Sequence, residues 1–290
     1  MWHVRQVLKF ALGLFGATIL AAAVAAVPEH GGHYLRTVLS RFVDVAHFEF
    51  GVSSISGLEA STLVAQRLPA TLELMLAGAF VALVVGAPLG VLLGRGRALR
   101  AAAPLIQLVA AAPVFCAGLG LLWLASRVLH WSYTPQSLSW PALAGGGRPA
   151  LLSALSTLAL PGLTVGAAGA AAVQLAVRHA ESTAIEEPYR HGLRLLGLSS
   201  FEVDRLYLAP QIFARSLASF GDIVLALFSA TAVAEWLFGW PGAAVLFLKS
   251  VALHDWNVTA LVLLVFAAVS LLADLCGTVA ARVLGGASQS

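Results

Sequence analysis

Acidic side chains stand inside or at the ends of apolar runs at four points of this 290-residue chain: Glu73, Asp222, Glu235 and Asp274. An ionisable group in a membrane span is costly, so such groups usually face a substrate or ion pathway or pair with one another. Acids held near the bilayer midplane could couple proton or ion movement to transport. For Glu235 the alternative is a structural tie to the turn that follows it, and we favour that interpretation.

The remaining reactive side chains form no recognised catalytic pattern. A Gly-x-x-x-x-Gly-Lys-Ser/Thr run is absent, and Lys9 and Lys249 are the only lysines. The sequence has no His-Glu-x-x-His and no Ser-His or Cys-His pair at an identifiable site. His30 and His33 have a spacing that hints at metal, but a bare His-x-x-His in a polar loop is weak evidence. We therefore predict no catalytic residue, no metal site and no cofactor bound by this chain.

The composition is that of a membrane protein with several helical spans. Hydrophobic residues make up 59% and charged residues 11% of the chain, and the mean hydropathy is +0.88. Soluble domains carry about a quarter charged residues. The net charge of +3 comes without a basic run interleaved with aromatics, so we predict no nucleic-acid partner.

Six apolar runs are long enough to cross a bilayer. Pro113 is expected to kink the third run, and Pro161-Gly162 to break the fourth. The predicted spans cover about 8–27, 69–93, 103–128, 150–177, 217–238 and 258–284.

A polar segment, 178–215, separates the fourth and fifth runs and carries five arginines. With six spans and the N-terminus inside, 11 of the 17 Lys and Arg residues fall on the cytoplasmic side and 6 outside. This excess predicts that both termini and the segment 178–215 are cytoplasmic.

The first half of the polar segment predicts two short helices around a turn. Apolar residues recur at three- and four-residue steps over 186–196, Gly197 is a natural helix stop, and Ser199 or Ser200 can cap a helix from Phe201. Such a rigid knob suits docking to another protein; the alternative is a solvated loop with no partner.

Several sequence runs resemble one family of transport proteins. They are Tyr189, Arg194 and Gly197-Leu198-Ser199; Glu235-Trp-Leu-Phe238-Gly-Trp240-Pro241-Gly242; His254-Asp255-Trp256; Phe50-Gly51-Val52-Ser53; and Arg67-Leu-Pro-Ala-Thr-Leu-Glu-Leu74. Together they are similar to the membrane subunits of bacterial ABC importers, specifically the dipeptide/oligopeptide/nickel permease family. The resemblance covers about residues 48–284.

The resemblance implies an all-α integral membrane protein with six transmembrane helices, the type I ABC importer permease fold and cytoplasmic coupling helices. Its implied partners are a second permease, homologous or identical, two ABC ATPase subunits that bind ATP and Mg, an extracytoplasmic substrate-binding protein and the lipid bilayer. Its implied location is the bacterial cytoplasmic membrane. The implied ATPase-docking residues are Glu186, Glu187, Tyr189, Leu193, Arg194, Gly197, Leu198 and Ser199, and the implied outer gate is Glu235, Phe238, Trp240, Pro241 and Gly242.

We accordingly divide the chain into a first helix with a shortened loop (1–68), a five-helix core containing the coupling segment (69–284), and a short tail (285–290). The predicted function is ATP-driven import of di- or oligopeptides. The alternatives are an ABC permease for nickel or another small solute, an ATP-independent secondary transporter or channel using Asp222, Glu235 and Asp274, and a scaffold or intramembrane enzyme.

Overall fold

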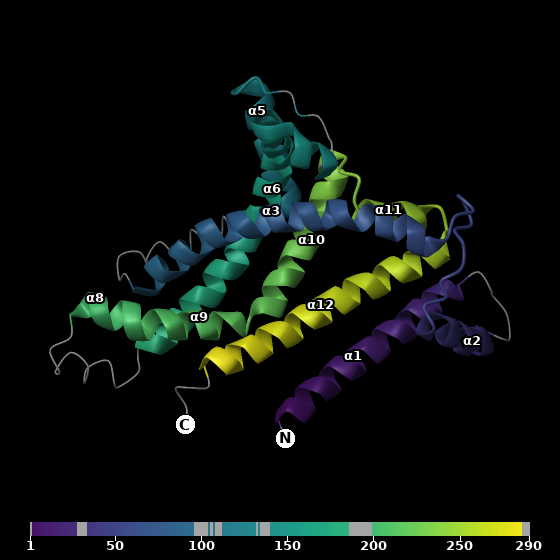
Figure 1. The fold of residues 1–290 in the computed structure, drawn as a ribbon, viewed down its shortest axis with the longest axis horizontal. Helices are drawn as coiled ribbons and strands as arrows, with labels where there is room; N and C mark the ends of the chain where they lie inside the picture. Colours follow the sequence, from purple (N-terminus) through teal and green to yellow (C-terminus); the bar gives the residue numbers. More distant parts are fainter. Residues whose placement is uncertain are drawn as a thin grey trace.

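The computed structural model describes residues 2–27, 34–95, 104, 107, 112–131, 133, 140–185 and 199–285 (Figure 1). Over these ranges the chain is an assembly of helices, and one isolated bridge between Val52 and Glu59 is its only β pairing. The elements are α1 (Trp2–Ala25), α2 (Tyr34–Ala46), α3 (Ala60–Arg95), α5 (Val114–Arg127), α6 (Trp140–Ile185), α8 (Ser200–Val203), the π-helix η1 (Asp204–Leu208), α9 (Ala209–Leu217), α10 (Phe220–Phe238), α11 (Ala243–Ala252) and α12 (Trp256–Gly285).

Helices α3 and α6 form the central pair, and glycines let their backbones approach closely. A Cβ atom added at Gly86 would come 2.6 Å from the Ala170 carbonyl oxygen, and one at Gly90 would come 2.7 Å from the Val177 Cβ. The residues of α3 and α6 that touch each other move toward the C-terminal end of both helices together, so the two helices run parallel. Small residues at helix interfaces permit this approach in membranes, where apolar packing and not water exclusion holds helices together.

The terminal helices α1 and α12 run antiparallel beside each other (Figure 1). The start of α1 and the end of α12 therefore lie at the same end of this pair, where α12 also packs against α9. Helix α11 and the start of α12 lie at the opposite end. The start of α1, the end of α12 and α9 are thus on one side of the assembly, and the cytoplasmic location of that side stays a prediction.

Among the described residues, five helices are long and apolar enough to cross a membrane: Arg5–Ala25, Ala60–Gly94, Leu155–Ala184, Phe220–Phe238 and Trp256–Leu284. They correspond to the first, second, fourth, fifth and sixth predicted spans. The third predicted span is represented by α5, which has 14 residues, while most of 101–111 lies outside the described residues. The third span, and with it the count of six, remains a prediction. Pro113, predicted to be a kink, stands in extended backbone immediately before α5 begins.

The break expected at Pro161-Gly162 and the start expected for the second span were wrong. Helix α6 continues through Pro161-Gly162, because the helix packs there against α3: a Cβ atom on Gly162 would lie 3.2 Å from the Ala77 Cβ. Such neighbours let membrane helices tolerate proline. Helix α3 begins at Ala60 and carries Pro69 inside, because its first turns pack Ala60 and Val64 against α12.

The loop expected between the first two spans also contains the helix α2. Its strong segregation of apolar and polar residues was not used in the sequence prediction, which treated this stretch as a loop of mixed polarity. Helix α2 packs against α1 through an edge-to-face contact between Phe15 and Phe42, with ring centroids 5.5 Å apart.

The polar segment 178–215 is described in part. Helix α6 extends through its first residues to Ile185, and α8, η1 and α9 form its last part. Ser199 caps α8, as predicted: its backbone N–H and hydroxyl donate to Glu202 Oε2 at 2.8 and 2.7 Å, and its hydroxyl oxygen accepts from the Glu202 N–H at 3.2 Å. This is a capping box. The hydrogen bonds from the Ser199 hydroxyl and amide hold the pKa of the Glu202 carboxyl below its usual range.

Replacing Ser199 by Ala is expected to loosen the start of α8. We expect the Glu202 amide to exchange its hydrogen several-fold faster, measured by hydrogen–deuterium exchange at pH 7. The pKa of Glu202 is lower in the folded state than in the unfolded state. The stabilisation that its carboxylate gives to the start of α8 is therefore complete at a pH above the ordinary pKa, and it is lost as the pH falls through the lowered pKa. Ser182→Ala is the control, because the Ser182 hydroxyl donates to the His179 carbonyl and caps no N–H. Equal exchange in the two variants would contradict the capping role.

Candidate functional site: the junction around Glu235

Glu235 lies at the end of α10 and caps the beginning of α11. Its side chain is fully buried. Glu235 Oε2 accepts from the Val245 N–H at 2.9 Å, and Oε1 accepts from the Thr71 hydroxyl at 2.6 Å. The Thr71 oxygen in turn accepts from the Ala243 N–H at 2.7 Å. The first N–H groups of a helix have no partner within the helix, so Glu235 and Thr71 together supply the cap that α11 needs.

The turn between α10 and α11 fits closely around this carboxylate. Gly239 ends α10 in the left-handed conformation, with φ of 65°, where glycine carries no steric cost. Gly242 must lack a side chain, because a Cβ atom there would overlap the Glu235 carboxylate. Trp240 is fully buried, and its indole N–H donates to the Ala70 carbonyl of α3 at 2.9 Å.

Two other members of the predicted gate complete the junction. The Pro241 carbonyl accepts from Arg67 Nη1 at 3.4 Å. The buried ring of Phe238 packs edge-to-face on Tyr133, with centroids 5.3 Å apart, and burial raises the pKa of the Tyr133 hydroxyl to about 12. Three of these hydrogen bonds therefore join the run 235–242 to the run 67–74, and a fourth joins Thr71 to Ala243, directly after the first run.

A second junction lies at the same end of the assembly, between the loop before α3 and the start of α12. The buried Asp255 accepts from the Ser53 hydroxyl at 2.5 Å and from the Ser54 N–H at 3.4 Å. Asn257 Nδ2 donates to the Val52 carbonyl at 2.9 Å. The runs 50–53 and 254–256 thus meet, just as 67–74 meets 235–242.

Sequence reasoning singled out these four runs but did not pair them. Thr71 and Asp255 were missing from the predicted site residues, although each lies within one of the runs. The only sequence evidence for these two residues was that each lies within one of the four runs. Thr71 and Glu235 are 164 residues apart, so no local sequence pattern could show that they form a hydrogen bond. The geometry agrees with the structural interpretation of Glu235: its carboxylate oxygens are engaged inside the protein.

The other acids are not brought to Glu235. Glu73 is buried in α3. Asp222 and Asp274 are exposed, and a Cβ atom on Gly221 would come 2.9 Å from Asp274 Cα, so both acids lie where the start of α10 meets α12. Glu235 is at the opposite end of α10, about 20 Å away for 13 helical residues. The row of coupling acids required by a secondary transporter is not assembled from these three residues.

The predicted docking residues Glu186, Glu187, Tyr189, Leu193, Arg194, Gly197 and Leu198 lie outside the described residues. Ser199 is described and serves as the cap of α8. The pair His30 and His33 also lies outside, and among the described residues no group of three or more His, Cys, Asp or Glu side chains could hold a metal ion.

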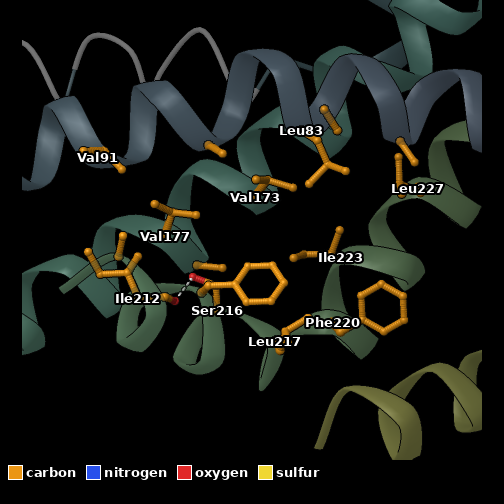
Figure 2. A pocket seen from close by; sticks show the side chains of 16 residues that line it. Leu83, Val91, Val173, Val177, Ile212, Ser216, Leu217, Phe220, Ile223 and Leu227 are labelled. Atoms are coloured by element: carbon orange, nitrogen blue, oxygen red, sulfur yellow. Dashed lines mark hydrogen bonds between the residues drawn. The ribbon is translucent and has the colours of Figure 1, made fainter. Parts of the chain in front are cut away.

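Two cavities lie against the central pair. One of about 430 Å³ separates α3 and α6 from α9 and α10, and Figure 2 shows apolar side chains such as Val91, Val177 and Ile223 around it. Its one hydroxyl, on Ser216, donates to the Ile212 carbonyl of its own helix at 2.7 Å. The other cavity, of about 500 Å³, lies between α3, α5 and α6 and is lined in part by Gln174.

The helices and the two junctions define a multi-pass, all-helical membrane protein. A family model described as the binding-protein-dependent transport system inner membrane component matches residues 82–286, and the chain belongs to this family. It is therefore a permease subunit of ABC transporters, located in the inner membrane.

Three curated relatives are similar over most of the chain. The peptide transport system permease protein SapB of Salmonella typhimurium is 24% identical over 265 residues, or 83% of each chain. The probable D,D-dipeptide transport system permease protein DdpB of Escherichia coli K12 is 26% identical over 229 residues, 73% of this chain and 67% of the relative. The putrescine export system permease protein SapB of Escherichia coli K12 is 22% identical over 280 residues, 88% of this chain and 87% of the relative.

Proposed function

We propose that this chain is a permease subunit of an ABC importer for di- or oligopeptides. It pairs with a second permease, and two ATPase subunits bind ATP and Mg and dock at the segment 178–215. An extracytoplasmic binding protein delivers the cargo at the opposite end, where the junctions around Glu235 and Asp255 lie. Two of the three relatives above are named for peptide transport, which supports the choice of cargo.

The observation that carries the proposal is the arrangement of the polar segment within a member of this permease family. The segment leaves α6 at Ile185 and returns through α8, η1 and α9 into α10. Helix α6 packs along α3, and α10 holds α11 through Glu235. A displacement of the segment by closing ATPases therefore moves helices that reach the opposite end, as rigid-body alternating access requires. The excess of Lys and Arg on this side supports a cytoplasmic location for it and for both termini.

Dipeptide-stimulated ATP hydrolysis tests the proposal. The permease is reconstituted in vesicles with its partner permease, ATPases and binding protein, and dipeptides, putrescine and Ni²⁺ are compared as stimulants. We expect dipeptides to stimulate hydrolysis and Leu193→Glu to lower the stimulated rate at least tenfold, since it replaces an apolar side chain by a charge in the proposed docking segment. Leu284→Glu is the control, because Leu284 is an exposed residue at the end of α12.

Stimulation by putrescine or Ni²⁺ but not by dipeptides would overturn the choice of cargo. Full transport by the permease chains without ATPases, or an unchanged rate in Leu193→Glu, would overturn the docking assignment.

A further inference from the structure

The cavity between α3, α5 and α6 contains a polar group that the fold does not use. Gln174 is 97% buried, since only 3% of it is exposed, and its Nε2 has no hydrogen-bond partner in the described part of the chain. A buried amide donor without a partner is destabilising, because the group has given up its hydrogen bonds to water and gained none in return. Polar groups that membrane helices keep at such a cost are candidates for a functional role, such as binding a ligand.

The rest of the cavity wall is mainly apolar, and half of the lining residues are small. Of its twelve lining residues six are alanines: Ala112, Ala117, Ala167, Ala168, Ala170 and Ala171. The hydroxyl of Thr164, also in the wall, donates to the Leu160 carbonyl of its own helix at 2.9 Å and is not offered to the cavity. The cavity volume of about 500 Å³ lies within the range of small-molecule binding sites.

The cavity lies near the middle of the helix assembly. A Cβ atom on Gly169 of α6 would come 2.5 Å from Leu227, which stands near the middle of α10. Gln174 follows Gly169 by five residues, or about one and a half helical turns. The cavity thus lies between the two ends of the assembly, level with the middle of α10.

We propose that Gln174 is a cargo-binding residue in the translocation path and that its amide donates to a main-chain carbonyl of the transported peptide. This rests on the proposed function. The main chain is the feature that all peptides share, so one donor on a wall of alanines binds it without selecting side chains. A single hydrogen bond also keeps binding weak, which a site of passage needs in order to release its cargo.

Natural cysteines report on occupancy of this cavity. Cys116 lines it and is exposed, whereas Cys276 is exposed on α12 and does not line it. In the reconstituted complex we expect a dipeptide, delivered by the binding protein and trapped with a non-hydrolysable ATP analogue, to slow modification of Cys116 by a methanethiosulfonate reagent at least fivefold. Modification of Cys276 in the same sample, followed by mass spectrometry, should not change.

A carbonyl-deletion analogue tests the hydrogen bond itself. For each variant, the KM for stimulated ATP hydrolysis is measured with a reduced-amide dipeptide and with the normal dipeptide, and the first KM is divided by the second. This KM ratio should be about 2- to 10-fold higher in the wild-type complex than in Gln174→Leu. The preference of the binding protein is the same for both variants and cancels from this ratio. Thr164→Val, in the same wall, should keep the wild-type ratio.

The outcomes separate the two proposals. If the wild-type complex is not stimulated by any dipeptide, the proposed function fails. If dipeptides stimulate it but Cys116 is not protected, or Gln174→Leu keeps the wild-type ratio, the assignment of Gln174 is wrong and the proposed function stands.

Discussion

Replacing Glu235 by Ala is expected to lower the free energy of unfolding by about 3 kcal/mol. The change leaves the Thr71 hydroxyl and the Val245 N–H without acceptors in a buried site, and each buried unpaired group costs about 1–3 kcal/mol. For a chain of this size the midpoint of thermal unfolding in detergent should fall by roughly 5–10 °C. The purified permease chain is sufficient for this measurement.

Glu59→Ala is the matched control, because Glu59 is an exposed carboxylate at the same end of the assembly. Glu235→Gln keeps an acceptor oxygen in a side chain of the same shape and should lie between wild type and Glu235→Ala. A midpoint for Glu235→Ala within about 1 °C of Glu59→Ala would show that the carboxylate does not hold the junction and would revive its assignment to the transport path.

Replacing Gly86 by Leu is expected to separate α3 from α6. A Cβ atom at Gly86 would meet the Ala170 carbonyl oxygen at 2.6 Å, and a backbone oxygen cannot rotate away as a side chain can. Overpacking of this kind costs roughly 3 kcal/mol, and the folded yield in membranes should drop severely. The measurement is the amount of monodisperse protein recovered by size-exclusion chromatography after extraction.

Gly120→Leu makes the same substitution in a helix where nothing lies within 4 Å of the added Cβ atom. It should be recovered like wild type, and similar losses in both variants would point to a general effect of leucine and not to the α3–α6 contact.

The helical membrane class could be predicted from the sequence because apolar length alone determines it. The last predicted span, 258–284, agrees with α12 to within two residues at each end. Proline misled the prediction at Pro161, since local propensity treats proline as a helix stop while packing against α3 carries α6 through it. The start of the second span, expected at 69, lies at Ala60, where α3 packs against α12.

Only part of the candidate site could be predicted from the sequence. Glu235, Trp240 and Gly242 were identified as one signature, and the structural interpretation of Glu235 agrees with its contacts. Their partners in α3 could not be predicted, because a hydrogen bond across 164 residues depends on how whole helices pack. The buried amide of Gln174 carries no sequence signal at all within an alanine-rich run.

The unbroken course of α6 has a mechanical consequence. Its 46 residues span about 70 Å at 1.5 Å per residue, more than twice the roughly 30 Å thickness of the hydrocarbon layer. Such a rod extends beyond the bilayer or tilts strongly within it, and in either case acts as a lever rather than as a simple span. The contacts with α3 extend from Gly162 to Glu181, so a displacement at the Ile185 end is carried along the two helices together toward the Trp140 end.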